Sequence, residues 1–233
     1  DATRYVDQAR AALPKLFTRF PKADVKVKRM DLFSEAGDAA ARYQSPAIDG
    51  SQPGHFVMNL ANTRRIPRYA LEVLSYHEAI PGHHMQTALA QENKALPLFR
   101  QRQWYVAYGE GWALYSEQLG KELGFYTTPL SEVGRLADSM WRAARLVVDT
   151  GIHSKGWTRE QAQAFLRDNT ALSSNEIETE VDRYIGWPGQ ALAYYLGEMS
   201  IEKSRAKAEA ALGPKFNIRA FHDTVLAMGS VPL

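Results

Sequence analysis

The segment that most constrains this chain is HEAIPGHHMQ, which occupies residues 77–86. Three of the six histidines of the chain fall within these positions, and Glu78 directly follows the first of them. Pro81 removes a helical backbone hydrogen bond and Gly82 permits a tight reversal, so a regular helix is not expected to continue through them. The segment therefore predicts a helix that is interrupted at Pro81–Gly82 and carries a polar cluster beside the interruption.

The residue types in this segment are those of a metal site. Zinc binds histidine nitrogen and carboxylate oxygen, and a catalytic zinc site keeps one position open for water. In the common His-Glu-x-x-His helix both histidines share a face and the glutamate reaches the water. Here His83 and His84 follow His77 by six and seven residues. On an ideal helix His84 returns to the face of His77, ~10.5 Å further along the axis, whereas a loop at residues 81–82 would bring His83 there instead. Spacing alone leaves both open.

A third ligand is predicted in GEGWALYSE, residues 109–117. Glu110 and Glu117 are seven residues apart, which places them on one face of a helix. Glu110 stands between glycines in an apolar and aromatic stretch, and a carboxylate buried there needs a partner. A metal ion is a suitable partner. The alternative interpretation of residues 109–117 is a helix start with an exposed acid. The alternative interpretation of residues 77–86 is a helix end with exposed histidines.

The rest of the chain indicates a mainly α protein with a small antiparallel β-sheet near its N-terminus. With 45% hydrophobic residues in 233, the chain has enough apolar content for a sizeable core. Residues 1–66 combine one helix with strand-like segments at 24–30, 40–44 and 54–60, and we expect them to form a small α/β edge region. Residues 67–233 form the helical region with the metal site, and both regions belong to a single domain over 1–233. The predicted helices cover 2–13, 67–80, 98–123 with an interruption at Gly109 and Gly111, 130–153, 158–169, 174–185, 189–212 and 217–228.

Charge and composition exclude several classes of protein. The net charge is +2 without a long basic run, so nucleic acid is not expected as a partner. The absence of cysteine excludes disulfides and thiolate ligands, and it leaves the compartment open between the bacterial cytoplasm and the periplasm or secretion. No stretch approaches 18 consecutive apolar residues, so no membrane span is expected. The chain opens at Asp1 rather than Met, which fits a mature form or a fragment.

Four separated motifs together resemble the bacterial family named domain of unknown function 885. They are HEAIPGHHMQ, GEGWALYSE, DTGIHSKGW and RYIGWPGQALAYYLG, and the matching part spans about residues 50–200. The family is similar to the zinc peptidases that use two histidines and one glutamate as ligands, including the thimet oligopeptidase and carboxypeptidase Taq groups. The resemblance implies a zincin-like helical metallopeptidase domain with one zinc ion per chain and a peptide substrate. Because members of the family are longer, it also implies that an N-terminal domain of the same protein is missing here.

The resemblance also implies roles for individual residues. In those peptidases a Gly-His pair carries the second ligand, and a later Glu with another Glu seven residues on supplies the third; Gly82-His83 and Glu110 with Glu117 match this pattern. The ligands it favours are His77, His83 and Glu110, with Glu78 as the general base. Glu117 is expected to contact a ligand residue rather than the metal ion itself. The gap between the first two histidines is longer than in the family pattern, so His84 remains an alternative to His83.

Late in the chain, several polar residues are candidates to stabilise an oxyanion, which needs preorganised donors. The resemblance to a paired tyrosine in the related peptidases favours Tyr194 over Tyr195, which we place with the substrate, and Arg183 lies in the same motif. Asp149 and His153 are four residues apart and could pair on one helix face, leaving His153 to donate to the oxyanion. Alternatively Asp149 orients a ligand histidine, or His153 simply stabilises a helix C-terminus. The alternative for Tyr194 and Tyr195 is that both are ordinary aromatic residues of the core.

Two further histidines and an asparagine complete the candidates. In SQPGHFVMN, His55 and Asn59 lie on a predicted strand after a turn. If that strand is an edge strand, an extended peptide could pair with it and Asn59 could hold its backbone; the alternative is that both residues only support the sheet. His222 has no motif around it and is expected at the surface.

These observations lead to one hypothesis and one rival. The hypothesis is a zinc-dependent peptidase in which Glu78 is the general base and a tyrosine, with His153 or Arg183, stabilises the oxyanion. The rival is a non-catalytic or truncated module of the same fold that binds peptides. The adjacent His77 and Glu78 favour the enzyme, because a binding module does not need the base.

Overall fold

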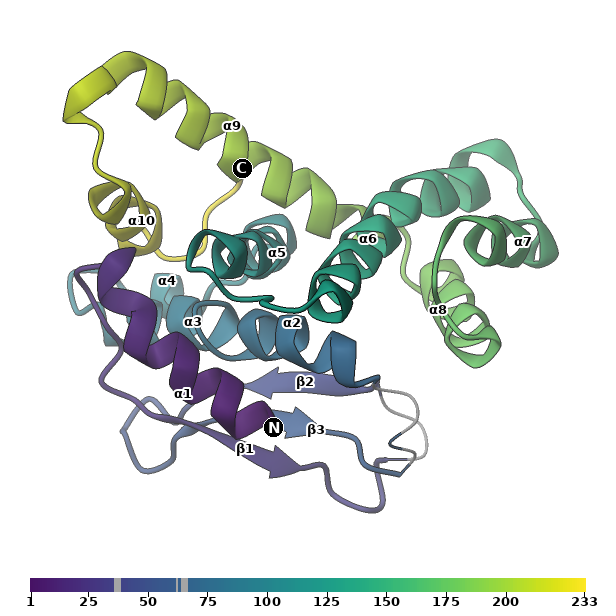
Figure 1. Ribbon diagram of the computed structural model, residues 1–233, viewed down its shortest axis with the longest axis horizontal. Helices are drawn as coiled ribbons and strands as arrows, with labels where there is room; N and C mark the ends of the chain where they lie inside the picture. Colours follow the sequence, from purple (N-terminus) through teal and green to yellow (C-terminus); the bar gives the residue numbers. More distant parts are fainter. Residues whose placement is uncertain (36–38, 62, 64–66) are drawn as a thin grey trace.

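The computed structural model of the chain describes residues 1–35, 39–61, 63 and 67–233 (Figure 1). Residues 36–38, 62 and 64–66 of the predicted edge region lie outside the described residues. The protein is mainly helical with a small sheet near the N-terminus, as the sequence predicted. In chain order the α-helices and strands are α1 (Ala2–Ala12), β1 (Val25–Arg29), β2 (Ala41–Gln44), β3 (Gly54–Met58), α2 (Arg68–Glu78), α3 (His83–Glu92), α4 (Leu98–Arg102), α5 (Val106–Glu122), α6 (Pro129–Lys155), α7 (Arg159–Asn169), α8 (Ser174–Gly186), α9 (Ala193–Leu212) and α10 (Ile218–Ala227), and short 3₁₀ turns occupy Leu13–Lys15, Gln190–Leu192 and Gly213–Lys215.

The sheet is mixed, so the predicted antiparallel sheet is wrong in this respect. Its strand order is β1-β3-β2. β2 and β3 form an antiparallel hairpin in which Ala41 faces Met58, whereas β1 runs parallel to β3 with Val25 opposite Gly54. The hairpin docks onto β1 through its second strand, and β3 therefore becomes the central strand and β2 an edge strand.

Two hydrophobic cores organise the helices. The larger one joins α1, α2, α5, α10 and the inner face of the sheet around residues such as Phe17, Phe56, Tyr76 and Trp112, all fully buried. The smaller one joins α6, α7 and α8 around Val148, Leu166 and Val181. In Figure 1, α6 runs from the centre of the molecule to the right, where α7 and α8 pack against it. α6 thus packs against α2 on one side and belongs to the smaller core on the other.

The predicted interruption at Pro81–Gly82 is confirmed, and it forms a tight reversal. α2 ends at Glu78 and α3 begins at His83. The Gly82 amide donates to the carbonyl oxygen of Tyr76 (3.0 Å). A Cβ atom on Gly82 would lie 1.9 Å from the carbonyl oxygen of His77, so only glycine fits this close approach. The reversal brings His83 back beside His77.

The predicted interruption at Gly109 and Gly111 is wrong, because both lie inside α5. The break in this stretch lies instead at residues 103–105, between α4 and α5. Gly111 marks the point where α5 crosses α9: a Cβ on Gly111 would lie 2.4 Å from the carbonyl carbon of Gly197, and a Cβ on Gly197 would lie 1.9 Å from the Ala107 carbonyl oxygen. The crossing fixes α9, which carries Tyr194, against α5, which carries Glu110.

The expectation of a surface position for His222 is also wrong. His222 lies on α10 and is fully buried. It sits against the ring of Phe17 (centroids 4.9 Å apart), bonds the carbonyl oxygen of Leu16 (2.9 Å), and accepts from the Tyr115 hydroxyl (2.9 Å).

Across the described residues, none of the helices combines the length and apolar character needed to cross a bilayer.

Candidate functional site

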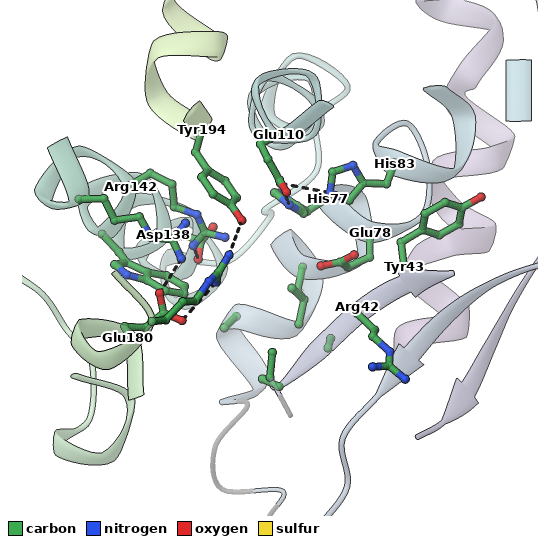
Figure 2. A pocket seen from close by; sticks show the side chains of 18 of the residues that line it. Arg42, Tyr43, His77, Glu78, His83, Glu110, Asp138, Arg142, Glu180 and Tyr194 are labelled. Atoms are coloured by element: carbon green, nitrogen blue, oxygen red, sulfur yellow. Dashed lines mark hydrogen bonds and ion pairs between the residues drawn. The ribbon is translucent and has the colours of Figure 1, made fainter. Parts of the chain in front are cut away.

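Three predicted ligands meet at the junction of α2, α3 and α5. His77 lies in the last turn of α2, His83 begins α3, and Glu110 lies in the second turn of α5. One oxygen of Glu110 (Oε2) is 3.6 Å from Nε2 of His77 and 3.3 Å from Nε2 of His83. The two imidazole rings lie edge to face with their centroids 4.8 Å apart. Figure 2 shows all three side chains converging on one point.

This geometry fits a tetrahedral metal. Ligand atoms about 2.0–2.1 Å from zinc in a tetrahedral site lie about 3.3 Å from one another. The two Glu110–imidazole distances are close to that value. The three ligand atoms all lie within 4.8 Å of one another, so small side-chain movements would bring them onto one ion.

Glu117 orients the first histidine. Its Oε1 accepts a hydrogen bond from Nδ1 of His77 (2.7 Å). Both side chains are buried. A carboxylate on one ring nitrogen fixes the tautomer and leaves the lone pair of the other for a metal, so Nε2 of His77 faces the Glu110 oxygen as a free ligand atom. This is the supporting position expected for Glu117.

The site is electrostatically prepared for a cation. Burial acts to lower the pKa of His77, but Glu110 and Glu117 outweigh it and raise that pKa well above its usual value. Burial acts to raise the pKa of Glu110. The neighbouring His83 and His77 imidazoles outweigh this effect and hold that pKa far below its usual value. Burial raises the pKa of Glu117 to about 8, so the lowered pKa of Glu110 is the one that indicates a need for positive charge, which either protons or a metal ion can supply.

His84, the alternative ligand, faces the sheet. Its Nε2 donates to the Ala23 carbonyl oxygen (3.0 Å) and its Nδ1 accepts from the Tyr43 hydroxyl (3.1 Å). Its side chain is fully buried, and burial lowers its pKa to about 4. His84 is thus a neutral imidazole, and both of its ring nitrogens have hydrogen-bond partners. The geometry favours His83 over His84 as the second ligand.

The cluster opens into a cleft of about 1000 Å³. One wall is the edge strand β2 with α2 and α3, and the opposite wall is formed by α6 and α8. Glu78 is buried next to His77 in the chain and lines this cleft. In Figure 2 its carboxylate lies below the two imidazoles. Trp104 also lines the cleft, with its ring centroid 5.6 Å from that of His83.

Tyr194 and Arg183 meet in the opposite wall. The Tyr194 oxygen accepts from Nη2 of Arg183 (3.0 Å) and lies 3.2 Å from Nε2 of Gln190. The Tyr194 ring is stacked at 6.5 Å from the ring of His77. With two N–H donors directed at its oxygen, the Tyr194 hydroxyl has its own hydrogen left to donate. Tyr195, the neighbour, does not line the cleft within the described part of the chain.

His153 and Asp149 do not form the predicted pair. His153 is exposed at the end of α6, and its Nε2 bonds the carbonyl oxygen of Tyr184 (2.9 Å). Asp149 is buried and accepts from the Gly189 amide (3.1 Å). Asp149 thus holds the turn that leads into Gln190 and Tyr194. It touches neither ligand histidine, and among the residues that the structure describes His153 is not part of the cleft wall.

The predicted substrate residues His55, on β3, and Asn59, directly after it, have structural positions. Asn59 is buried and its Nδ2 donates to the carbonyl oxygens of Glu35 (2.6 Å) and Ala39 (3.3 Å). His55 lies on the central strand opposite Lys26. β3 has a neighbour on both sides, so a peptide cannot pair with it. The edge that faces the cleft belongs to β2, through residues such as Tyr43.

The sequence interpretation missed the polar wall of α6. Arg142 and Arg145 are buried in the cleft wall, and Asp138 pairs with Arg142. Their spacing of four and three residues places them on one face of the predicted helix 130–153. That pattern is visible in the sequence, but a run of Asp and Arg on a helix is normally read as a solvated face.

Fold and site together define a mainly helical protein with a candidate His-His-Glu metal centre at the base of a deep cleft. The chain belongs to the family described as bacterial protein of unknown function (DUF885), whose model matches residues 1–233. No protein with a curated description matches it.

Two solved structures resemble the whole fold. A crystal structure from Colwellia psychrerythraea is 44% identical with a TM-score of 0.98, covering 100% of this chain and 40% of the other. A structure from Shewanella oneidensis is 26% identical with a TM-score of 0.78, covering 97% of this chain and 43% of the other. Each is described as a "putative lipoprotein", the second one of unknown function. The chain thus spans less than half the length of these relatives.

Proposed function

We propose that this protein is a zinc-dependent hydrolase that cleaves peptide bonds. The observation that carries the proposal is the convergence of His77, His83 and Glu110 on one point, with Glu78 beside them in the same cleft. Two histidines and one carboxylate are a common ligand set of catalytic zinc, with the fourth position open. A zinc ion bound there supplies Lewis acidity and lowers the pKa of water.

Glu78 is the residue placed to move the proton. It lies at the end of α2, one residue after the ligand His77, and its carboxylate faces the cleft (Figure 2). In the proposed reaction Glu78 accepts a proton from the attacking water and then delivers it to the leaving amine. Its position at the helix end, where the chain reverses, keeps it close to both imidazoles without making it a ligand.

Tyr194 is the donor proposed for the oxyanion. Arg183 and Gln190 hold its oxygen, and its ring lies next to His77. A hydroxyl held in this way is preorganised, which is the property that makes an oxyanion donor effective. Arg183 acts through Tyr194 and is a positioning residue. His153 is not proposed for this role.

An extended peptide is the substrate that the cleft walls suit. β2 is an edge strand that lines the cleft, and no strand pairs with its outer edge in the part of the chain that the structure describes. Edge strands bind extended peptides through main-chain hydrogen bonds. We therefore place the peptide along β2 rather than along β3.

Zinc content tests the metal centre. The protein is expected to carry one zinc ion per chain after passage over a desalting column, measured by elemental analysis. His77→Ala and Glu110→Ala each remove a ligand and should abolish stoichiometric zinc. A matched control is His153→Ala, at an exposed histidine outside the cleft, which should keep it. Retention of zinc by both ligand variants would show that the ligand set is wrong.

Hydrolysis by Glu78→Gln tests the base. The substitution keeps the size and removes the proton-accepting carboxylate, so zinc content and fold should be retained while peptide hydrolysis slows by at least ~10²-fold. The rate is measured on a library of short peptides by mass spectrometry. An active wild type whose Glu78→Gln variant is equally fast would exclude Glu78 from the reaction. A wild type that binds zinc and peptides but cleaves none would instead support the rival, a peptide-binding module.

The descriptions of the relatives bear on location. Both solved structures are described as a "putative lipoprotein", and we infer from this a place at the bacterial cell envelope rather than in the cytoplasm. Fractionation of cells that express the full-length protein tests this inference. Recovery with the cytosol would contradict it.

A further inference from the structure

Three arginines gather in the cleft wall opposite β2. Arg142 and Arg145 lie on α6, and Arg183 lies on α8. The first two residues are only 5% and 1% exposed. Arg145 lies between two aromatic rings, 4.2 Å from the centroid of Trp141 and 4.4 Å from that of Tyr194. Such tight packing holds the guanidinium groups in place and excludes water from them.

The charges in this wall do not balance. Asp138 pairs with Arg142, and Glu180 is shared between Arg145 (2.9 Å) and Arg183 (3.5 Å). Guanidinium groups stay charged in proteins. Three cations therefore face two paired carboxylates among the described residues. The excess is one positive charge in a poorly solvated place, where an unpaired charge is costly.

Two other nearby acids, Glu117 and Glu198, form no ion pair with these arginines among the described residues. The positive charge of Arg142 acts to lower the pKa of both Glu117 and Glu198. Glu117 is already bonded to His77. Burial raises the pKa of Glu198 to about 7, so a large part of it is neutral near neutral pH.

Two buried guanidinium N–H groups also lack partners. Within the described residues, no protein group bonds Nε of Arg142 or Nη1 of Arg145. Buried donors are rarely left unsatisfied, and an unmet donor on a charged group is especially costly. An anionic group that enters the cleft would both neutralise the excess charge and approach these donors. Carboxylate matches a guanidinium in geometry as well as in charge.

The wall is close to the metal centre. The Tyr194 ring lies 4.4 Å from the Arg145 guanidinium carbon and 6.5 Å from the His77 ring. The guanidinium is therefore no more than about 11 Å from His77, which an extended peptide spans in about three residues. A carboxylate bound at the arginines belongs to a residue within reach of a peptide bond at the metal centre.

We propose that Arg142, Arg145 and Arg183 form a subsite for a substrate carboxylate, so that the cleft selects peptides with an anionic group within about three residues of the bond at the metal centre. The inference rests on the proposed peptidase function for its substrate, but the subsite can be measured as binding alone. The carboxylate is either the free C-terminus of a short peptide or an acidic side chain. These two sources are separated in the test.

The experiment measures binding by calorimetry to the zinc-incubated Glu78→Gln protein, so that turnover does not interfere. The probes are an N-acetylated alanine tripeptide with a free C-terminus, its C-terminal amide, and an amide with glutamate as the last residue. The free acid, the glutamate amide or both should bind about tenfold or more tightly than the plain amide, because charge-assisted hydrogen bonds are roughly twice as strong as neutral ones. Whichever anionic probe binds tightly identifies the source.

Substitutions then locate the subsite. Arg145→Met and, as the milder change, Arg183→Gln should each reduce the acid-over-amide preference from about tenfold to less than about threefold, because a charge-assisted pair is lost. Arg159→Gln is the matched control, since Arg159 also pairs with α8, through Asp182, but is exposed and outside the cleft wall. If Arg145→Met does not fold, Arg183→Gln alone decides.

Two results would overturn the subsite. One is equal binding of all three probes by the parent protein. The other is a preference that survives in a folded Arg183→Gln variant. Zinc content is measured on the same samples: a preference without zinc would retain the subsite and reject the peptidase, whereas zinc and hydrolysis without a preference would do the reverse.

Discussion

His83 and His84 are neighbours in the chain, yet they serve different parts of the molecule. Adjacent residues on a helix point about 100° apart. His83 therefore faces Glu110 in the cleft, and His84 faces Ala23 and Tyr43 at the sheet. His84 holds the edge strand β2 by its Tyr43 contact, so it shapes the cleft without reaching the metal centre.

Alanine substitutions should separate the two histidines. His83→Ala should lose stoichiometric zinc, because it removes a ligand. His84→Ala should keep zinc but lower the free energy of unfolding by about 1–3 kcal/mol, because the partly buried Ala23 carbonyl and Tyr43 hydroxyl lose their partner. Elemental analysis and urea denaturation measure both effects. Loss of zinc in His84→Ala, together with its retention in His83→Ala, would reverse the assignment.

For single residues, the sequence predicts how residues close in the chain are arranged. It does not predict contacts between residues that are far apart in the chain. Glu110 and Glu117 follow from a spacing of seven residues on one helix, and the reversal at Pro81–Gly82 follows from the properties of those two residues. The contact of Glu117 with His77 joins two helices, so no local pattern contains it. The same holds for Arg145, whose burial depends on α8 and α9.

At the scale of elements, the crossing of α5 and α9 sets the distance between the two sides of the site. α5 carries Glu110 and α9 carries Tyr194, and the helices approach closely where Gly111 meets Gly197. The sequence predicted a break at the glycines of α5, because glycine lowers helix stability. Tertiary packing overrides that preference, since only glycine allows two backbones to come so close.

A methyl group at this crossing should be destabilising. In Gly197→Ala the new Cβ would meet the Ala107 carbonyl oxygen at 1.9 Å, so the helices must separate. The free energy of unfolding should fall by about 1–3 kcal/mol or more, and zinc-dependent hydrolysis should fall with it as Tyr194 shifts. Gly186→Ala, at an exposed position with open space around it, is the control. Urea denaturation curves of both variants, equal in midpoint, would show that the crossing tolerates a side chain.

The strand order illustrates the same limit. The alternating segments at 24–30, 40–44 and 54–60 predicted three strands, and the described residues form a strand in each of these segments. Alternation tells which residues face the core, but it does not tell which strand lies beside which. The hairpin β2–β3 docks on β1 through β3, and this choice makes β2 the edge that lines the cleft.

At the scale of the whole molecule, the beginning and the end of the described chain are held together around His222. Its ring lies between α10 and the segment after α1, with Leu16, Phe17 and Tyr115 as partners. Next to it, the Asp223 carboxylate accepts from the Thr18 amide (3.1 Å). A histidine without a motif was expected at the surface because sequence alone does not show that both of its ring nitrogens find partners from distant segments.

This arrangement predicts that the protein loses stability in mild acid. Burial lowers the pKa of His222 to about 4, whereas a histidine in an unfolded chain titrates near 6.5. Between these values the unfolded chain binds the additional proton, so the free energy of unfolding falls as the pH is lowered from about 6.5 to about 4, by up to about 3 kcal/mol from this group. Below about pH 4 the folded protein also binds the proton and the loss from His222 ends.

Urea denaturation at pH values from 7 to 4 measures this dependence in wild type and in His222→Gln. The glutamine keeps an amide donor for the Leu16 carbonyl but cannot titrate. His222→Gln should be less stable at pH 7, because it loses the ring contact with Phe17, and it should show a shallower decline toward pH 4. Leu226→Ala, on the same helix, lowers stability by creating a cavity and should keep the wild-type slope. The carboxylates and the buried His84 contribute to the slope in all three proteins, so the difference between the slopes isolates His222. If His222→Gln declined as steeply as wild type, the buried neutral histidine would not be the group that couples folding to pH.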